Sequence, residues 1–145
     1  RGDARLSLMR DLNRIGSRGY DLLAVDVFSG DSPPVHLLTQ EALALYLDHL
    51  ASHGLLAMNI SATHVNLKPV IAGLARAAGL SGVIIEDFGD GEGCFPSRWI
   101  VMARQDDAFD DTLWRAFPRL QTALDPDLRI WTDSYSNVIQ IMARP

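Results

Sequence analysis

The chain contains one cysteine, Cys94, among its 145 residues. An intramolecular disulfide is therefore excluded, and nothing in the cysteine content points to an oxidising compartment. No apolar run approaches the roughly 20 residues that a membrane-spanning helix needs, and the opening segment RGDARLSLMR lacks the apolar core of a signal peptide. We therefore expect a cytoplasmic chain in which this segment makes no contact with a membrane.

Basic residues are fewer than acidic residues in this sequence. The chain has 13 Lys and Arg against 18 Asp and Glu, which gives a formal net charge of -5. A protein whose main work is binding nucleic acid needs a basic face, so this class is disfavoured. An acidic site suits a small cationic molecule, and we expect such a ligand.

Hydrophobic residues, by contrast, are abundant. They make up 48% of the sequence, which is enough to build the core of one ordinary domain over residues 1–145. The sequence also opens on a charged segment without an initiator Met. We therefore expect a single, partial domain that belongs to a longer protein.

Helical and strand patterns alternate along the chain. Apolar residues at helical spacing predict helices over 3–13, between Thr39 and Gly54, over 66–79 and over 110–117, and apolar runs predict strands over 20–28, 55–60, 83–88, 99–103 and 137–142. The mainly apolar run at 20–28, although broken by charge, is typical of a strand covered on both faces. This order implies an α/β fold with a mainly parallel sheet, and the glycine-rich segment GDGEGCFPS predicts an antiparallel return of the late strand.

Polar residues follow the predicted strands at the point where each strand ends. Ligands of parallel α/β sheets bind beyond the carboxyl ends of the strands. Burying a carboxylate costs several kcal/mol unless it is partnered, so Asp26 must lie at a wet rim or be held by hydrogen bonds. The plain alternative is that Asp26 only caps the following loop. The polar groups expected to gather at this rim are Asp26, Asp31, Asn59, Ser61 and Asp87.

The segment YDLLAVDVFSGDSPPVHLLTQEAL, residues 20–43, resembles the central part of the spermidine and spermine synthase family of polyamine aminopropyltransferases, and its bacterial spermidine synthase-like members in particular. Four further segments resemble the same family in the same order: GDARLSL, HGLLAMNIS, FPSRWIVMAR and WTDSYSN. The resemblance therefore covers nearly the whole chain. It implies the C-terminal portion of a Rossmann-like, S-adenosylmethionine methyltransferase-like domain, without its N-terminal strands.

The resemblance also implies an activity, the transfer of an aminopropyl group from decarboxylated S-adenosylmethionine to putrescine or a related amine. A primary amine with a pKa near 10.4 arrives as an ammonium and must lose a proton before it attacks. By position, Asp26 resembles the family's catalytic aspartate and Asp31 the aspartate that holds the amine. Phe95 and Ser97 match a family TyrProSer motif, although Phe95 lacks the tyrosine hydroxyl that helps to position the amine.

On the donor side, Asp3 and Ala4 resemble the acid and the small residue that contact the donor's adenine. The donor would be a co-substrate, decarboxylated S-adenosylmethionine or S-adenosylmethionine, with no tightly bound cofactor. The family's glycine-rich donor loop has no counterpart here, so we expect this segment alone to bind the donor poorly. A metal site is not expected, because His49 and His53, four residues apart, fall short of the usual three ligands.

Two other functions remain open from the sequence. One is a methyltransferase of the same fold, and the other is a binding or interaction module without catalysis. A sheet that lacks its N-terminal strands leaves one side open, so we expect self-association into a homo-oligomer under any of these functions.

Overall fold

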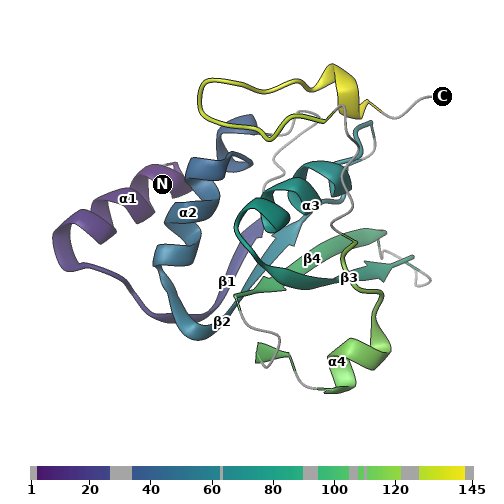
Figure 1. Ribbon diagram of the computed structural model, residues 1–145, viewed down its shortest axis with the longest axis horizontal. Helices are drawn as coiled ribbons and strands as arrows, with labels where there is room; N and C mark the ends of the chain where they lie inside the picture. The colour runs from purple at the N-terminus through teal and green to yellow at the C-terminus, as the bar shows by residue number, and fades with distance from the viewer. Residues whose placement is uncertain are drawn as a thin grey trace.

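Four strands form one mixed sheet with α2 and α3 on one face, α1 beside α2, and α4 on the opposite side (Figure 1). This computed structural model describes residues 3–26, 34–62, 64–89, 95–104, 108–109, 111–121 and 128–142. The elements are α1 (Ala4–Ile15), β1 (Tyr20–Asp26), η1 (Val35–Leu37), α2 (Gln40–Asp48), β2 (Leu50–Asn59), α3 (Lys68–Ala77), β3 (Ser81–Asp87), β4 (Ser97–Ala103), α4 (Asp111–Ala116) and η3 (Ile139–Ile141).

The strand order is β1-β2-β4-β3. β1 and β2 pair in parallel, whereas β4 pairs antiparallel with both β2 and β3. The α/β class and the antiparallel late strand are confirmed. A mainly parallel sheet is not confirmed. β4 runs antiparallel and lies between β2 and β3, and so separates two strands that would otherwise pair in parallel.

β1 is an edge strand of the described sheet, and only one of its faces is covered. Val25 is buried, but Leu22 is 58% exposed and Ala24 is also exposed. The expectation that this strand is covered on both faces was wrong. The helix on that side, α4, packs with a small cluster around Val83, Ala103 and Phe109 and does not extend over β1.

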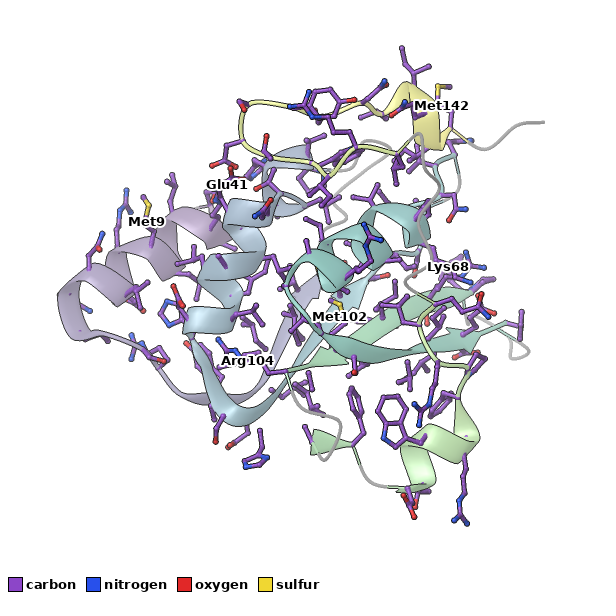
Figure 2. All side chains as sticks on the ribbon, in the orientation of Figure 1. Met9, Glu41, Lys68, Met102, Arg104 and Met142 are labelled. Atoms are coloured by element: carbon purple, nitrogen blue, oxygen red, sulfur yellow. The ribbon has the colours of Figure 1, made fainter. Side chains whose placement is uncertain are left out.

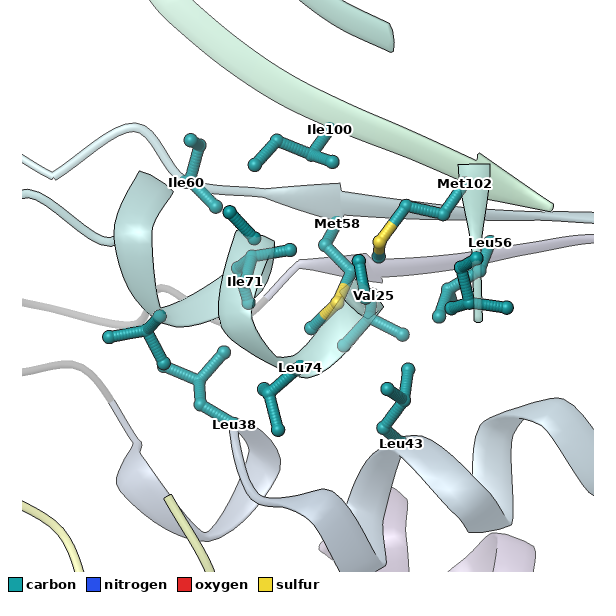
Figure 3. Packing of buried hydrophobic residues seen from close by; sticks show 14 of the residues in the cluster. Val25, Leu38, Leu43, Leu56, Met58, Ile60, Ile71, Leu74, Ile100 and Met102 are labelled. Atoms are coloured by element: carbon teal, nitrogen blue, oxygen red, sulfur yellow. The ribbon is translucent and has the colours of Figure 1, made fainter. Parts of the chain in front are cut away.

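The main core lies between the sheet and the pair α2 and α3 (Figure 3). Val70, Ile71, Leu74 and Ala75 recur at helical spacing, so α3 presents one apolar stripe to the strands. Apolar surface buried in this way stabilises the fold by roughly 25 cal/mol per Å². The strands and α2 meet the α3 stripe with Val25, Leu43, Leu56, Met58, Ile100 and Met102.

Gly54 lies inside β2, and α2 ends before it at Asp48. The expected helix end at Gly54 was therefore wrong. The register jumps from Tyr20↔Leu50 to Leu22↔Leu55, so β2 bulges away from β1 between these pairs. A Cβ on Gly54 would lie 2.5 Å from the carbonyl oxygen of Tyr20, so this close approach of two backbones explains the glycine.

The C-terminal tail crosses the N-terminal end of α2 (Figure 1), where the carbonyl of Trp131 accepts a hydrogen bond from the Gln40 N–H at 2.9 Å. The predicted strand over 137–142 was wrong, because Ile139–Ile141 forms a 3-10 turn. Ile139 is exposed while Ile141 is buried, although both would lie on one face of a strand. Packing of Ile141 into the core therefore replaces strand pairing here.

Candidate functional site

Asp26 and Asn59 end the parallel strands β1 and β2 and are direct partners in the register. Asn59 donates a hydrogen bond from Nδ2 to Oδ1 of Asp26 at 3.1 Å, and the Asp26 side chain lies at the exposed rim of the sheet. The two conditions that the sequence suggested for this carboxylate, solvent access and a hydrogen-bonding partner, therefore hold together. A ligand can therefore reach the Asp26 carboxylate, which also has a hydrogen-bonding partner in Asn59.

Ser61 orients the Asn59 amide. Oδ1 of Asn59 accepts hydrogen bonds from the Ser61 N–H at 2.9 Å and from its hydroxyl at 2.5 Å. Because two donors occupy the amide oxygen, the amide nitrogen must face Asp26. The Ser61 hydroxyl in turn accepts the Arg98 N–H at 2.7 Å, so hydrogen bonds run from β4 across the rim to Asp26.

A cavity of about 470 Å³ opens beside this network, lined by residues 60–62, 86–88 and 95–98. Phe95 and Ser97, which the sequence places on the acceptor side, both lie in its wall, together with Asp87. Phe88 and Phe95 are 72% and 86% exposed. The cavity thus combines two open aromatic rings with polar groups from three strand ends.

The cavity also contains an ion pair that the sequence did not suggest. Nε of Arg98 lies 2.5 Å from Oε1 of Glu86, its direct cross-strand partner. The two residues stand twelve positions apart on either side of the β3–β4 connection. The pairing depends on the antiparallel register of these strands, so it could have been predicted from the sequence if that register had been known.

A larger hollow of about 640 Å³ lies on α1, lined by Ser7, Arg10, Asp11, Asn13 and Arg14. All of these residues belong to one helix. A single helix surface cannot converge polar groups on a ligand from several sides, whereas the rim cavity draws on three strands. The rim cavity is therefore the better candidate site.

Asp3 serves as the N-cap of α1. Its Oδ1 accepts the Leu6 N–H at 2.9 Å, and its Oδ2 lies 2.8 Å from Nε2 of His36. The backbone hydrogen bond from Leu6, aided by His36, holds the pKa of the Asp3 carboxyl below its usual range. Ala4, exposed at the first position of α1, stands beside it.

Asp133 joins the tail to α1 and α2. Its carboxylate accepts two hydrogen bonds from the Arg5 guanidinium, at 2.7 and 2.5 Å, and one from the Thr39 hydroxyl at 2.8 Å. The Asp133 N–H donates to Glu41 at 3.0 Å, under the tail at the start of α2 (Figure 2). The Arg5 hydrogen bonds keep the pKa of Asp133 low. This assembly holds the tail against the starts of α1 and α2.

His49 is fully buried and holds α1 to the start of β1. Its Nδ1 accepts the Arg18 N–H at 3.3 Å, so the ring proton is assigned to Nε2, which donates to the Leu8 carbonyl at 2.9 Å. His49 is thus a structural residue. In the described part of the chain, no group of three or more His, Cys, Asp or Glu side chains is arranged to hold a metal.

Two residues singled out from the sequence, Asp31 and Cys94, fall outside the described residues. The structure brings Asp26, Asn59 and Ser61 together at the rim and places Asp87 in the adjoining cavity. None of the helices within the described ranges has the length and apolar character needed to cross a bilayer.

No model of a known protein family matches the chain, and no curated protein matches its sequence. The family resemblance of the five sequence segments therefore stays a prediction.

Proposed function

We propose that the chain is an aminopropyltransferase-like domain with a Rossmann-like, methyltransferase-like fold, acting on a small polyamine such as putrescine. The observation that carries the proposal is the exposed Asp26 carboxylate, oriented by Asn59 at the carboxyl ends of two parallel strands. An antiparallel strand inserted late in the sheet supports the proposed fold.

In the proposed reaction, decarboxylated S-adenosylmethionine is the donor substrate and the amine is the acceptor. Asp26 anchors the acceptor ammonium and accepts its proton, directly or through water. The freed nitrogen attacks the aminopropyl carbon beside the sulfonium. The new C–N bond forms as the C–S bond breaks, and the sulfur keeps the bonding pair and leaves as a neutral thioether.

The surroundings of Asp26 suit an acceptor of this kind. The chain carries a net charge of -5, and the adjoining cavity offers aromatic rings against which methylene groups can pack. Phe95 has no hydroxyl to position the attacking nitrogen, so this task falls to Asp26, which the Asn59 amide orients. On the donor side, Asp3 and Ala4 stand together at the start of α1 as the proposed adenine contact.

The test is an assay of the chain for transfer from decarboxylated S-adenosylmethionine to putrescine, with the thioether product measured by mass spectrometry. Asp26→Asn should lower turnover by about 100-fold, the lower end of what a positioned acid or base contributes. Asp21→Asn is the matched control, because Asp21 is an exposed carboxylate on the same strand.

Turnover that is unchanged in Asp26→Asn would remove this residue from the mechanism. Putrescine binding without any turnover would contradict the transferase and favour an amine-binding module, and the absence of both would end the proposal.

A further inference from the structure

The C-terminal tail, residues 128–142, contacts the starts of two different helices. At one end, the Trp131 carbonyl accepts the Gln40 N–H at the first position of α2, at 2.9 Å. At the other end, the Ile141 carbonyl accepts the Asn66 N–H at 2.7 Å, just before α3. Figure 1 shows the tail passing from the start of α2 to the start of α3. One segment therefore holds both helix starts.

Each contact serves the helix that begins there. The first N–H groups of a helix have no partner within it and need an acceptor from elsewhere. The Trp131 carbonyl is such an acceptor for α2, and Thr39, the N-cap of α2, donates its hydroxyl to Asp133 of the tail at 2.8 Å. At α3, the Asn66 side chain accepts the Lys68 N–H at 3.2 Å. The tail thus fixes a residue whose side chain serves the first turn of α3.

The tail is anchored in the core at both ends. Trp131 and Ile141 are 1% and 3% exposed and belong to the same apolar cluster. Between them the tail binds itself, because Thr132 and Tyr135 exchange backbone hydrogen bonds at 2.9 and 3.1 Å. Tyr135 also packs against the cluster. A segment that packs as one piece on one cluster is expected to open as a cooperative unit.

The closed tail also carries a cost. Among the described residues, the Trp131 indole N–H is buried without a hydrogen-bonding partner. A buried donor of this kind loses the hydrogen bonds that water would give it. Opening the tail would restore them, so the free-energy difference between the closed and the open tail is smaller than the apolar packing alone would give.

We infer that the tail is a strap that opens and closes over the starts of α2 and α3 as one unit. The two helices follow the parallel strands β1 and β2, whose carboxyl ends carry Asp26 and Asn59. The strap therefore lies beside the edge at which ligands of parallel α/β sheets bind. Opening of the strap would release both helix starts at that edge together. This device does not depend on the proposed reaction.

The experiment is amide hydrogen exchange of the isotopically labelled full chain, followed residue by residue by NMR. In the wild type, the Gln40 and Asn66 N–H groups should be protected to a similar degree and less than the amides of β2 between β1 and β4. Ile141→Val removes one buried methyl group and should lower protection about fivefold at both Asn66 and the distant Gln40. Ile139→Val, in the same turn but 79% exposed, is the matched control and should change neither.

A substitution at the other end tests the coupling in reverse. Asp133→Asn weakens the contacts of the tail with Arg5 and Thr39 at the start of α2. It should lower the protection of the Asn66 N–H, at α3, about threefold, as expected for a partly exposed charge. Because Asp133 lies outside the apolar core, this variant decides the question if Ile141→Val fails to fold.

Loss of protection confined to the substituted end in either variant would overturn the inference, because the two ends would then open separately. Gln40 and Asn66 amides that exchange only as slowly as the central strand would overturn it too, since the tail would then open only with the whole fold. Equal effects of Ile139→Val and Ile141→Val would show that the buried anchor does not hold the strap, and would also overturn it.

Discussion

Arg5 and Asp133 lie 128 positions apart in the sequence and meet through two parallel hydrogen bonds between a guanidinium and a carboxylate. Asp133 also receives the Thr39 hydroxyl, which itself caps α2 through the Ala42 N–H. One carboxylate therefore links the first helix, the second helix and the tail. Asp3 and His36 lie next to this link, because Arg5 also donates to the His36 carbonyl at 2.8 Å and His36 in turn contacts Asp3.

Replacing Arg5 by Lys should lower the free energy of unfolding by at most about 1 kcal/mol, because lysine cannot form the paired hydrogen bonds and Asp133 is partly exposed. Urea denaturation measures the change. Arg10→Lys, on the outer surface of the same helix, is the control and should be neutral. An Arg5→Lys variant as stable as wild type would show that the link only orders the tail.

The same link should weaken in acid. Hydrogen bonds from Arg5 lower the pKa of Asp133 from its ordinary value of 3.8, so the folded state holds the proton less tightly than the unfolded chain. The stability that Asp133 contributes is thus complete well above pH 3.8 and is lost as the pH falls through its lower folded pKa. The stability difference between wild type and Asp133→Asn should shrink below about pH 4. A difference that stays constant from pH 7 to pH 3 would contradict this account.

Gly54→Ala should destabilise the fold by about 2 kcal/mol or more, because the new Cβ would lie 2.5 Å from the Tyr20 carbonyl oxygen and force β1 and β2 apart. Thermal unfolding followed by circular dichroism measures the loss. Ser52→Ala changes an exposed side chain in the same bulge and should stay within about 0.5 kcal/mol of wild type. Equal effects of the two substitutions would argue against the close approach.

His49→Leu should cost about 1–3 kcal/mol, since it leaves the Arg18 N–H without its acceptor in a partly buried place. His53→Leu, four residues on and exposed, is the matched control. Denaturant titration of both variants compares the loss at the buried histidine with the loss at the exposed one. A larger loss in His53→Leu than in His49→Leu would reverse the assignment.

Local patterns in the sequence predicted local structure well. The stripe of α3 and the Thr39 cap of α2 follow from residue spacing and side-chain chemistry, and both are present. Three predictions were wrong: that β1 is covered on both faces, that α2 ends at Gly54, and that the tail forms a strand. Each of these features depends on which distant segment packs against the element. An apolar run such as Tyr20–Asp26 has the same sequence pattern whether the strand lies at the edge of a sheet or in its centre.

The residues around the candidate site likewise include some that the sequence pattern predicted and some whose contacts depend on the tertiary fold. Asp26, Asn59 and Ser61 were expected at one rim because parallel strands end at the same edge, and their hydrogen bonds bear this out. Arg5 and Asp133 carry no sequence signal for each other, since their contact is made only when the two ends of the chain meet.

The uncovered edge of β1 has a consequence for amide exchange with solvent. Successive peptide groups of a strand point to opposite sides, so within the described sheet only alternate N–H groups of β1 face β2. Deuterium uptake along β1 should therefore alternate between slow and fast from one residue to the next, while in the part of β2 between β1 and β4 it stays slow throughout. Loss of that alternation would report that another strand has come to lie against β1.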